Sequence, residues 1–261
     1  MNKESILLRR KEHESFQGVR FIGFDLDGTL FAEPKKNFPQ VFATLISPTL
    51  HIPFERAENF AAETMGIATK QQLAMLPDTL NIPQTHILRQ LPTELQEIIA
   101  QAIDLQFFNQ PVDLFPEITK TLGKLQKSNV RLFISSSRPT ENIQTLLKLH
   151  PELATHIEFA IGTDTNDPSL KKGESHFRKA AEHFHMPFEN FVQQSIFIGD
   201  TPSDMQAAQS IGVRAIGRVG TTLPENLLHH GASLVLHDFS SLPHLLNSRR
   251  KLFSAGKYGR R

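Results

Sequence analysis

FIGFDLDGTLF, residues 21–31, joins an apolar run to two carboxylates and a glycine. The apolar residues 19–24 predict a buried strand. Because side chains two positions apart on a strand point to the same side, Asp25 and Asp27 converge just past its carboxyl end, where open α/β sheets bind ligands. Gly28 lets the backbone turn tightly and offers its N–H to an anion.

Two neighbouring carboxylates repel each other, and a divalent cation removes that conflict. In a chain without cysteine, ligands that are all oxygens favour Mg²⁺. The competing interpretation is a solvated turn, because Asp and Gly are ordinary turn residues. Three later stretches of the chain bear on this choice.

The first stretch is LFISSSRP, residues 132–139, where another apolar strand ends in hydroxyls at the same edge of the sheet. Ser135 can donate a hydrogen bond to a phosphate oxygen, assisted by the N–H groups after it, although serine also caps helices. The second stretch is SLKKGESHF, residues 169–177. A lysine at a helix start adds charge to an already positive end and indicates a bound anion, with a solvated lysine pair as the alternative.

The third stretch is FIGDTPSDMQAAQSIG, residues 197–212, which repeats the opening pattern. An apolar strand leads to Gly199 and Asp200, and Asp204 follows at the start of a helix. Asp204 taken alone fits a helix cap. A second acidic strand end in the same sheet favours a shared site over two unrelated turns.

The chain has 261 residues, with 28 Lys+Arg against 27 Asp+Glu, so its net charge points to no particular partner. The absence of cysteine excludes disulfides, thiolate chemistry and cysteine-ligated zinc. No apolar run approaches the roughly 18 residues of a membrane span, and the first residues have too short an apolar stretch for a signal peptide. We therefore expect a soluble, cytoplasmic protein with no membrane partner.

Strand-like and helix-like segments alternate along most of the chain, which predicts an α/β fold with a parallel sheet and right-handed crossovers. The expected architecture is a Rossmann-like, doubly wound parallel sheet. The expected strands are 19–24, 130–134, 157–161, 195–198, 213–216 and 233–236, and the expected helices are 116–126, 139–149, 172–184 and 203–211.

Residues 32–114 interrupt this alternation with a stretch that has no convincing strand and is cut by prolines into helix-sized pieces. Thr93 and Gln96 fit a capping box at the start of one helix. Pro53 is placed to begin another, which would stop near Gly66. We expect an all-helical insert just after the first strand.

Together, DLDGT at 25–29, the strand end at Ser135, the lysine at 171–172 and GDTPSD at 199–204 resemble the four motifs of the haloacid dehalogenase-like phosphohydrolases. The similarity runs from about 19 to 246, and the last part resembles the phosphoglycolate-phosphatase-like branch. It implies a catalytic core of 19–31 and 115–247 and a helical cap of 32–114. A basic N-terminal extension, 1–18, and a basic C-terminal tail, 248–261, lie outside it.

The resemblance implies an Mg²⁺-dependent phosphatase that hydrolyses a small phosphorylated metabolite through an aspartyl-phosphate. Asp25 would be the nucleophile, and Asp27 would protonate the leaving group and activate water. The presence of Asp27 argues against dehalogenase activity. Asp25, the backbone carbonyl of Asp27 and Asp200 would hold the metal, with Asp204 bracing them. The phosphate contacts would be Gly28, Thr29, Ser135, Ser136 and a lysine, for which Lys172 is preferred over Lys171.

Three alternatives remain open. The same core serves sugar-phosphate mutases, and it also serves phosphonoacetaldehyde hydrolases, for which Lys70 would be the Schiff-base lysine. A non-enzymatic protein could use the basic ends, 1–18 and 248–261, to bind nucleic acid or an acidic partner, although solvated tails are the simpler interpretation. Oligomeric state is not indicated. The cap is expected to close over the phosphate, and its polar candidates for substrate selection are His51, Arg56, Lys70, His86 and Arg89.

Overall fold

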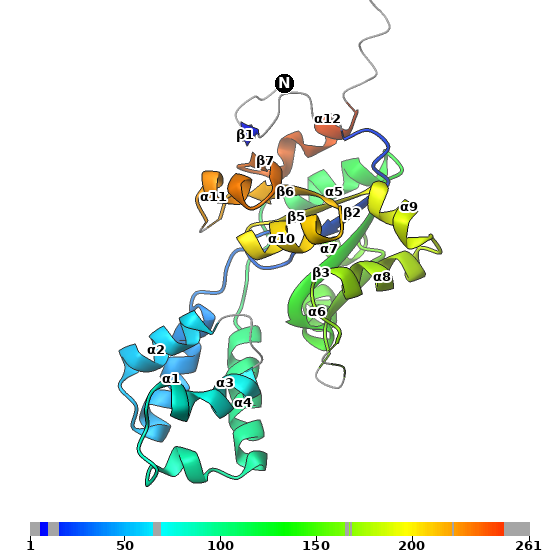
Figure 1. Ribbon diagram of the computed structural model, residues 1–261. Helices are drawn as coiled ribbons and strands as arrows, with labels where there is room; N and C mark the ends of the chain where they lie inside the picture. The colour runs from blue at the N-terminus through cyan, green and yellow to red at the C-terminus, as the bar shows by residue number, and fades with distance from the viewer. Residues whose placement is uncertain are drawn as a thin grey trace, which may run out of the picture. The chain divides into compact units, whose positions relative to one another are not determined.

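A seven-stranded sheet forms the centre of the larger part of the protein in this computed structural model (Figure 1). The structure describes residues 6–9, 16–64, 69–164, 167, 169–220 and 222–247. The strand order is β1-β7-β6-β5-β2-β3-β4, and every neighbouring pair is parallel except β1 with β7. The strands are β1 (Ile6–Arg9), β2 (Phe21–Phe24), β3 (Arg131–Pro139), β4 (Phe159–Thr163), β5 (Ser195–Gly199), β6 (Arg214–Arg218) and β7 (Ala232–Leu236).

This order confirms the predicted α/β fold with a parallel sheet. All six expected strands are present, with bounds that differ by a few residues. The additional strand is β1, which lies in the segment expected to be a basic extension and pairs antiparallel with β7 at the sheet edge. The remaining residues of 1–15 and the whole tail 248–261 lie outside the described residues, so the expectations for them stay predictions.

Two layers of helices cover the sheet. On one face, a cluster of buried aromatic and aliphatic side chains packs Phe21 and Phe133 against Phe177 and Phe191. On the other face, Phe24 meets Phe239, with ring centroids 5.8 Å apart. The helices are α5 (Ile118–Gln126), α6 (Thr140–Leu149), α7 (Pro151–Ala154), α8 (Glu174–His183), α9 (Phe188–Gln193), α10 (Pro202–Ser210), α11 (Pro224–His229), η3 (Phe239–Ser241) and α12 (Leu242–Asn247).

Residues Glu33–Val112 form a second compact unit, separate from the unit of Met1–Ala32 and Asp113–Arg261. Its described residues contain helices and no strand, and a core of its own includes Phe42, Phe60 and Ile103. Its elements are α1 (Phe38–Leu50), α2 (Phe54–Glu63), α3 (Thr69–Thr79), η2 (Ile87–Gln90) and α4 (Thr93–Phe108).

The predicted capping box at Thr93 is wrong. Pro92 occupies the N-cap position and Thr93 is already helical, with no side-chain cap hydrogen bond. The Gln96 side chain instead donates to the Leu91 carbonyl at 3.0 Å. The expected helix after Pro53 is present as α2, and its expected end at Gly66 lies outside the described residues.

The two chain segments that lead to and from the second unit pair with each other at the edge of the first. The Ala32 N–H donates to the Asp113 carbonyl at 2.8 Å, and the Phe115 N–H donates to the Leu30 carbonyl at 3.1 Å. This short ribbon follows directly on the DLDGT turn. Across the described part of the chain, no helix has the length and apolar character needed to cross a membrane.

Gly23 is the position where sheet packing leaves no room for a side chain. A Cβ built there would lie 2.5 Å from the Phe133 ring and 2.9 Å from the Phe197 ring. These rings therefore close over β2 directly beside Asp25, and they fix the strand that carries it.

We expect Gly23→Ala to lower the free energy of unfolding by about 1–3 kcal/mol, because the methyl group forces two buried rings apart. Gly123→Ala is the matched control. It lies inside α5 with its nearest neighbour, His156, at 3.6 Å, and should gain about 0.5–1 kcal/mol from helix propensity. Urea denaturation measures both, and a Gly23→Ala protein as stable as the wild type would contradict the packing argument.

Candidate active site

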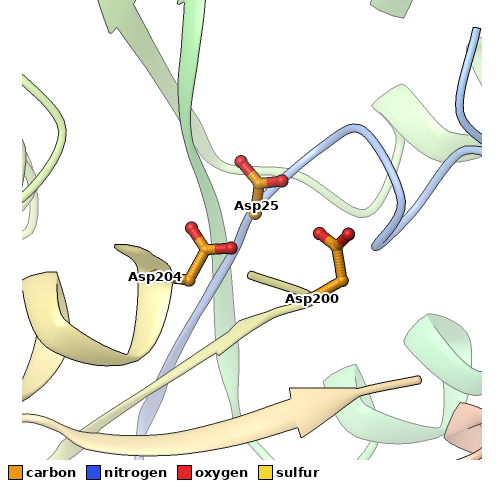
Figure 2. Close-up of side chains that lie close together, drawn as sticks. All are labelled: Asp25, Asp200 and Asp204. Atoms are coloured by element: carbon orange, nitrogen blue, oxygen red, sulfur yellow. The ribbon is translucent and has the colours of Figure 1, made fainter. Parts of the chain in front are cut away.

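Three buried carboxylates meet at the carboxyl edge of the sheet (Figure 2). Asp25 follows β2, Asp200 follows the adjacent strand β5, and Asp204 lies in the first turn of α10. One oxygen from each lies within 4.8 Å of the others, and their exposed fractions are 6%, 1% and 0%. The pairing of β2 with β5 thus brings Asp25 next to Asp200 and Asp204, which lie far from it in sequence.

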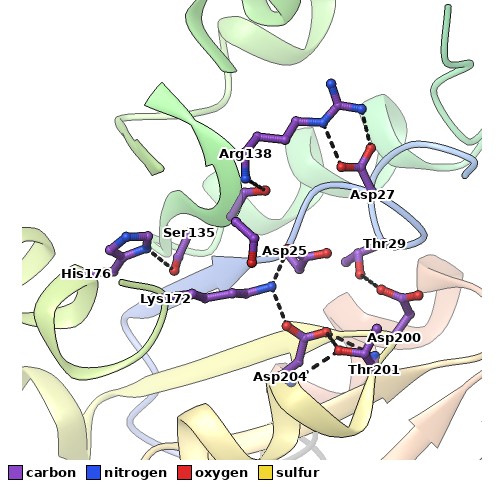
Figure 3. A network of polar contacts seen from close by, with 12 residues as sticks. Asp25, Asp27, Thr29, Ser135, Arg138, Lys172, His176, Asp200, Thr201 and Asp204 are labelled. Carbon is purple, nitrogen blue, oxygen red and sulfur yellow. Dashed lines mark hydrogen bonds and ion pairs between the residues drawn. The ribbon is translucent and has the colours of Figure 1, made fainter. Parts of the chain in front are cut away.

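Lys172 is the cation of this cluster, and its Nζ pairs with both Asp25 and Asp204 (Figure 3). Burial raises the pKa of the Asp25 carboxyl well above its usual range, Lys172 opposes the rise, and the carboxylates of Asp204 and Asp200 add to it. Burial alone would lower the pKa of Lys172, but Asp204 and Asp25 outweigh it and raise that pKa. Lys171, the other candidate, is exposed.

Gly28 brings the DLDGT turn against Asp200. It has φ +70°, and a Cβ there would lie 2.2 Å from an oxygen of Asp200. A residue with a side chain would be strained by this backbone and would displace the carboxylate. The next residue, Thr29, is fully buried and donates from Oγ1 to Asp200 Oδ1 at 3.0 Å. The turn therefore orients Asp200 by direct contact.

Asp204 has a structural partner besides Lys172. It forms a capping box with Thr201: the Thr201 hydroxyl donates to Asp204 Oδ2 at 2.6 Å, and the Thr201 N–H donates to the same oxygen at 3.0 Å. One oxygen of Asp204 thus fixes the start of α10 while the other faces Lys172. Asp204 therefore both caps α10 and belongs to the carboxylate cluster.

Ser135 and Ser136 are both buried and lie within β3, which continues to Pro139 and does not end at Ser135 as predicted. The Ser135 hydroxyl lies 2.9 Å from Nδ1 of His176, a fully buried residue of α8. The Ser136 hydroxyl accepts a hydrogen bond from the Arg138 N–H at 3.2 Å. Both hydroxyls thus already have protein partners, and their role as phosphate ligands stays a prediction.

Asp27 does not join the three carboxylates but pairs with Arg138 (Figure 3). Nε of Arg138 donates to Asp27 Oδ2 at 2.6 Å and Nη2 donates to Oδ1 at 2.6 Å, so both carboxylate oxygens are bound by one guanidinium fork. Arg138 belongs to the LFISSSRP stretch, and no role was predicted for it. It lies near the end of β3, three residues after Ser135, but nothing in the local sequence indicates that it pairs with Asp27.

Arg218 at the end of β6 is a second arginine that the motifs did not single out. Its Nη1 donates to the Gly28 carbonyl at 3.2 Å and its Nη2 to Glu117 at 3.1 Å. The guanidinium carbon lies 3.4 Å from the centroid of the Phe115 ring. Arg218 therefore ties the DLDGT turn to the segment that returns from the second unit.

The polar candidates in the second unit make contacts within that unit. Arg89 donates to the Ile82 carbonyl at 2.8 Å and pairs with Asp78 at 2.7 Å. Lys70 pairs with Glu97, and its side chain is 54% exposed, which offers none of the desolvation that a Schiff-base lysine needs. The other three also have local roles: Arg56 donates to the Leu80 carbonyl, His86 caps η2, and His51 ends α1 in the left-handed conformation.

The carboxylate cluster fits a divalent cation in both donor type and charge. Three carboxylates and one lysine leave a formal charge of −2, because the two nearby buried arginines have acids of their own: Arg138 pairs with Asp27 and Arg218 with Glu117. Oxygen donors of this kind suit Mg²⁺. The pKa of Asp25 is raised first by burial, and the neighbouring carboxylates of Asp204 and Asp200 add to that rise, as expected for a cluster with net negative charge.

Comparisons with known proteins agree with this geometry. The family model described as haloacid dehalogenase-like hydrolase matches residues 22–218. The phosphoglycolate phosphatase of Salmonella choleraesuis (strain SC-B67) is 26% identical over 216 residues, covering 78% of this chain and 82% of that protein. The protein of the same name from Photorhabdus laumondii subsp. laumondii is 27% identical over 232 residues, covering 87% and 92%.

Among solved structures, that of CbbY from Rhodobacter sphaeroides in complex with phosphate has a TM-score of 0.63 at 19% identity, covering 86% of this chain and 96% of that one. This likeness shows the fold. The family match shows the family as well as the fold, because it spans all four sequence motifs. The chain belongs to the haloacid dehalogenase-like hydrolases, and it is an enzyme of the phosphatase kind within that family.

His176 predicts an acid-sensitive stability. Burial, and then the charge of Lys172, lowers its pKa from the ordinary 6.5 to about 4. The unfolded chain therefore binds a proton more readily than the folded one, and stability falls as the pH drops from 6.5 towards 4. Relative to a His176→Gln variant, the wild type should lose about 2 kcal/mol between pH 7 and pH 5. Denaturant unfolding at both pH values measures this, and identical losses in the two proteins would contradict it.

Proposed function

We propose that this enzyme is an Mg²⁺-dependent phosphatase that hydrolyses a small phosphate monoester through an aspartyl-phosphate on Asp25. The main support for the proposal is that Asp25, Asp200 and Asp204 cluster at one edge of the sheet, where Lys172 pairs with Asp25 and Asp204. The curated relatives named phosphoglycolate phosphatase support a small phosphorylated substrate.

Asp25 would attack phosphorus, forming a bond from a carboxylate oxygen while the ester oxygen leaves with its electron pair. Lys172 would favour the ionised form of Asp25, against the effect of burial, and would hold it in one orientation, because it pairs with that carboxylate and is itself fixed by Asp204. Asp25 and Asp200 would hold Mg²⁺, with Asp204 beside them, and the bound ion would neutralise the negative charge that otherwise opposes attack on a phosphate dianion.

Asp27 would serve as the general acid and base. It lies at the same strand end as Asp25 and is one-quarter exposed, so it can reach groups that the buried carboxylates cannot. In this structure both its oxygens are bound by Arg138. Each of these oxygens keeps a second lone-pair site, through which Asp27 would donate a proton to the leaving oxygen or accept one from water. Closure of the helical unit over the phosphate stays a prediction.

Removal of the nucleophile tests the proposal directly. We expect Asp25→Asn to abolish hydrolysis of p-nitrophenyl phosphate, because an amide oxygen cannot form the acyl phosphate. Activity of the wild type should disappear with a chelator and return with Mg²⁺. Asp113→Asn, at an exposed acid, is the matched control and should keep full activity. Substantial turnover by Asp25→Asn, or chelator-resistant activity, would refute the proposed mechanism.

The role of Asp27 can be separated from that of Asp25 by varying the leaving group. Asp27→Asn should slow hydrolysis of alkyl phosphates by about 10²–10⁴-fold and of p-nitrophenyl phosphate much less, because a good leaving group needs little protonation. Steady-state rates over a series of phosphate esters give this dependence. Equal losses for good and poor leaving groups would show that Asp27 is not the acid.

A further inference from the structure

Arg218 makes three contacts at the carboxyl edge of the sheet. It ends β6 and is 5% exposed. Its Nη1 donates to the Gly28 carbonyl, its Nη2 donates to Glu117, and its guanidinium carbon lies 3.4 Å from the centroid of the Phe115 ring. Because a guanidinium is planar, it stacks on the ring while its edge donates both bonds in fixed directions.

The carbonyl that Arg218 binds belongs to the turn that orients Asp200. Gly28 has a left-handed backbone, and a Cβ there would lie 2.2 Å from an oxygen of Asp200. Thr29, the next residue, donates to Asp200 Oδ1 at 3.0 Å. The chain just after Arg218 also approaches this carboxylate, since a Cβ on Gly220 would lie 3.2 Å from Asp200 Oδ2. Two backbone segments thus contact one carboxylate, and the Arg218 side chain links them.

The charge of Arg218, taken alone, would oppose a metal ion. Burial lowers the pKa of the guanidinium, whereas the negative charges of Glu117, Asp200 and Asp238 raise it, so the arginine and Asp200 attract each other. A positive charge close to Asp200 disfavours a second cation at that carboxylate. Removing Arg218 would therefore tighten the binding of Mg²⁺ if charge were its only contribution, and would weaken it if the arginine holds the turn in place.

We propose that Arg218 is a positioning residue of the metal site, which fixes the Gly28 peptide and, through it, the orientation of Asp200 towards Mg²⁺. The inference rests on the proposed function in taking Mg²⁺ as the ion of the carboxylate cluster. In the described part of the chain, Arg218 has no hydrogen bond to the three carboxylates, so it acts through the turn. Residues that orient metal ligands in this way typically change metal affinity by about 10–100-fold.

The test is a calorimetric titration with Mg²⁺, without substrate, of the wild type, Arg218→Lys and Arg218→Met. Lysine keeps the charge but has neither the fork nor the flat face, so Arg218→Lys should bind Mg²⁺ about 10–100-fold more weakly. Arg218→Met should also bind more weakly, although it removes a positive charge. Wild-type affinity in Arg218→Lys, or tighter binding in Arg218→Met, would overturn the inference.

Phe115→Leu is a second variant, which leaves the arginine and every charge in place. Leucine offers no aromatic face to the guanidinium, so Mg²⁺ should bind more weakly than in the wild type and more tightly than in Arg218→Lys. If the arginine variants do not fold, wild-type affinity in Phe115→Leu overturns the inference.

Arg131→Lys is the matched control, because Arg131 begins β3 and pairs with Glu158 at the surface. It should keep the Mg²⁺ affinity of the wild type. A loss of affinity equal to that of Arg218→Lys would overturn the inference, since it would reveal a general effect of replacing arginine by lysine.

Urea denaturation without Mg²⁺ separates positioning from a purely structural role, because it measures what Arg218 contributes to the fold alone. An Arg218→Lys protein that is less stable but binds Mg²⁺ as tightly as the wild type would leave Arg218 only a structural role. The proposed function is tested apart from this inference. Absence of Mg²⁺ binding by the wild type would discard the metal site and the inference together, whereas undiminished binding by Arg218→Lys would discard the inference alone.

Discussion

Three carboxylates that share one lysine are the constraint on which the rest of the site depends. Asp25, Asp200 and Asp204 are buried where water cannot screen their repulsion, and Lys172 compensates for only part of their charge. Such a cluster destabilises the fold unless another cation joins it. The repulsion among the three carboxylates is already present in the folded chain, and it therefore favours the binding of a divalent ion.

The surrounding residues hold the three carboxylates close together. Two glycines lie where the backbone comes very close to a carboxylate. A Cβ on Gly28 would lie 2.2 Å from Asp200, and one on Gly199 would lie 2.4 Å from Asp204. Thr29 and Thr201 then fix one oxygen of each acid. Beneath the site, Phe133 and Phe197 cover Gly23 and hold β2 in place. Packing and hydrogen bonding thus hold the charges closer than they would lie in water.

The fold and the acidic cluster were predictable from sequence because both follow local rules. Buried parallel strands are continuous apolar runs, and polar residues at their carboxyl ends meet at one edge of the sheet, which was enough to bring Asp25 and Asp200 together. Arg138 and Arg218 were missed because their partners, Asp27 and Glu117, are 111 and 101 residues away, so no local pattern marks either pair. The strand β1 was missed because only its pairing with β7 defines it.

Calorimetric titration of the wild type with Mg²⁺ near pH 7 tests the central claim most directly, because it measures whether the buried charge is compensated by a metal, independently of any substrate. The structure predicts one bound ion, with binding abolished in Asp200→Asn and unchanged in Asp113→Asn. An absence of binding in the wild type, or equal affinity in Asp200→Asn, would contradict the claim that the carboxylate cluster is a metal site.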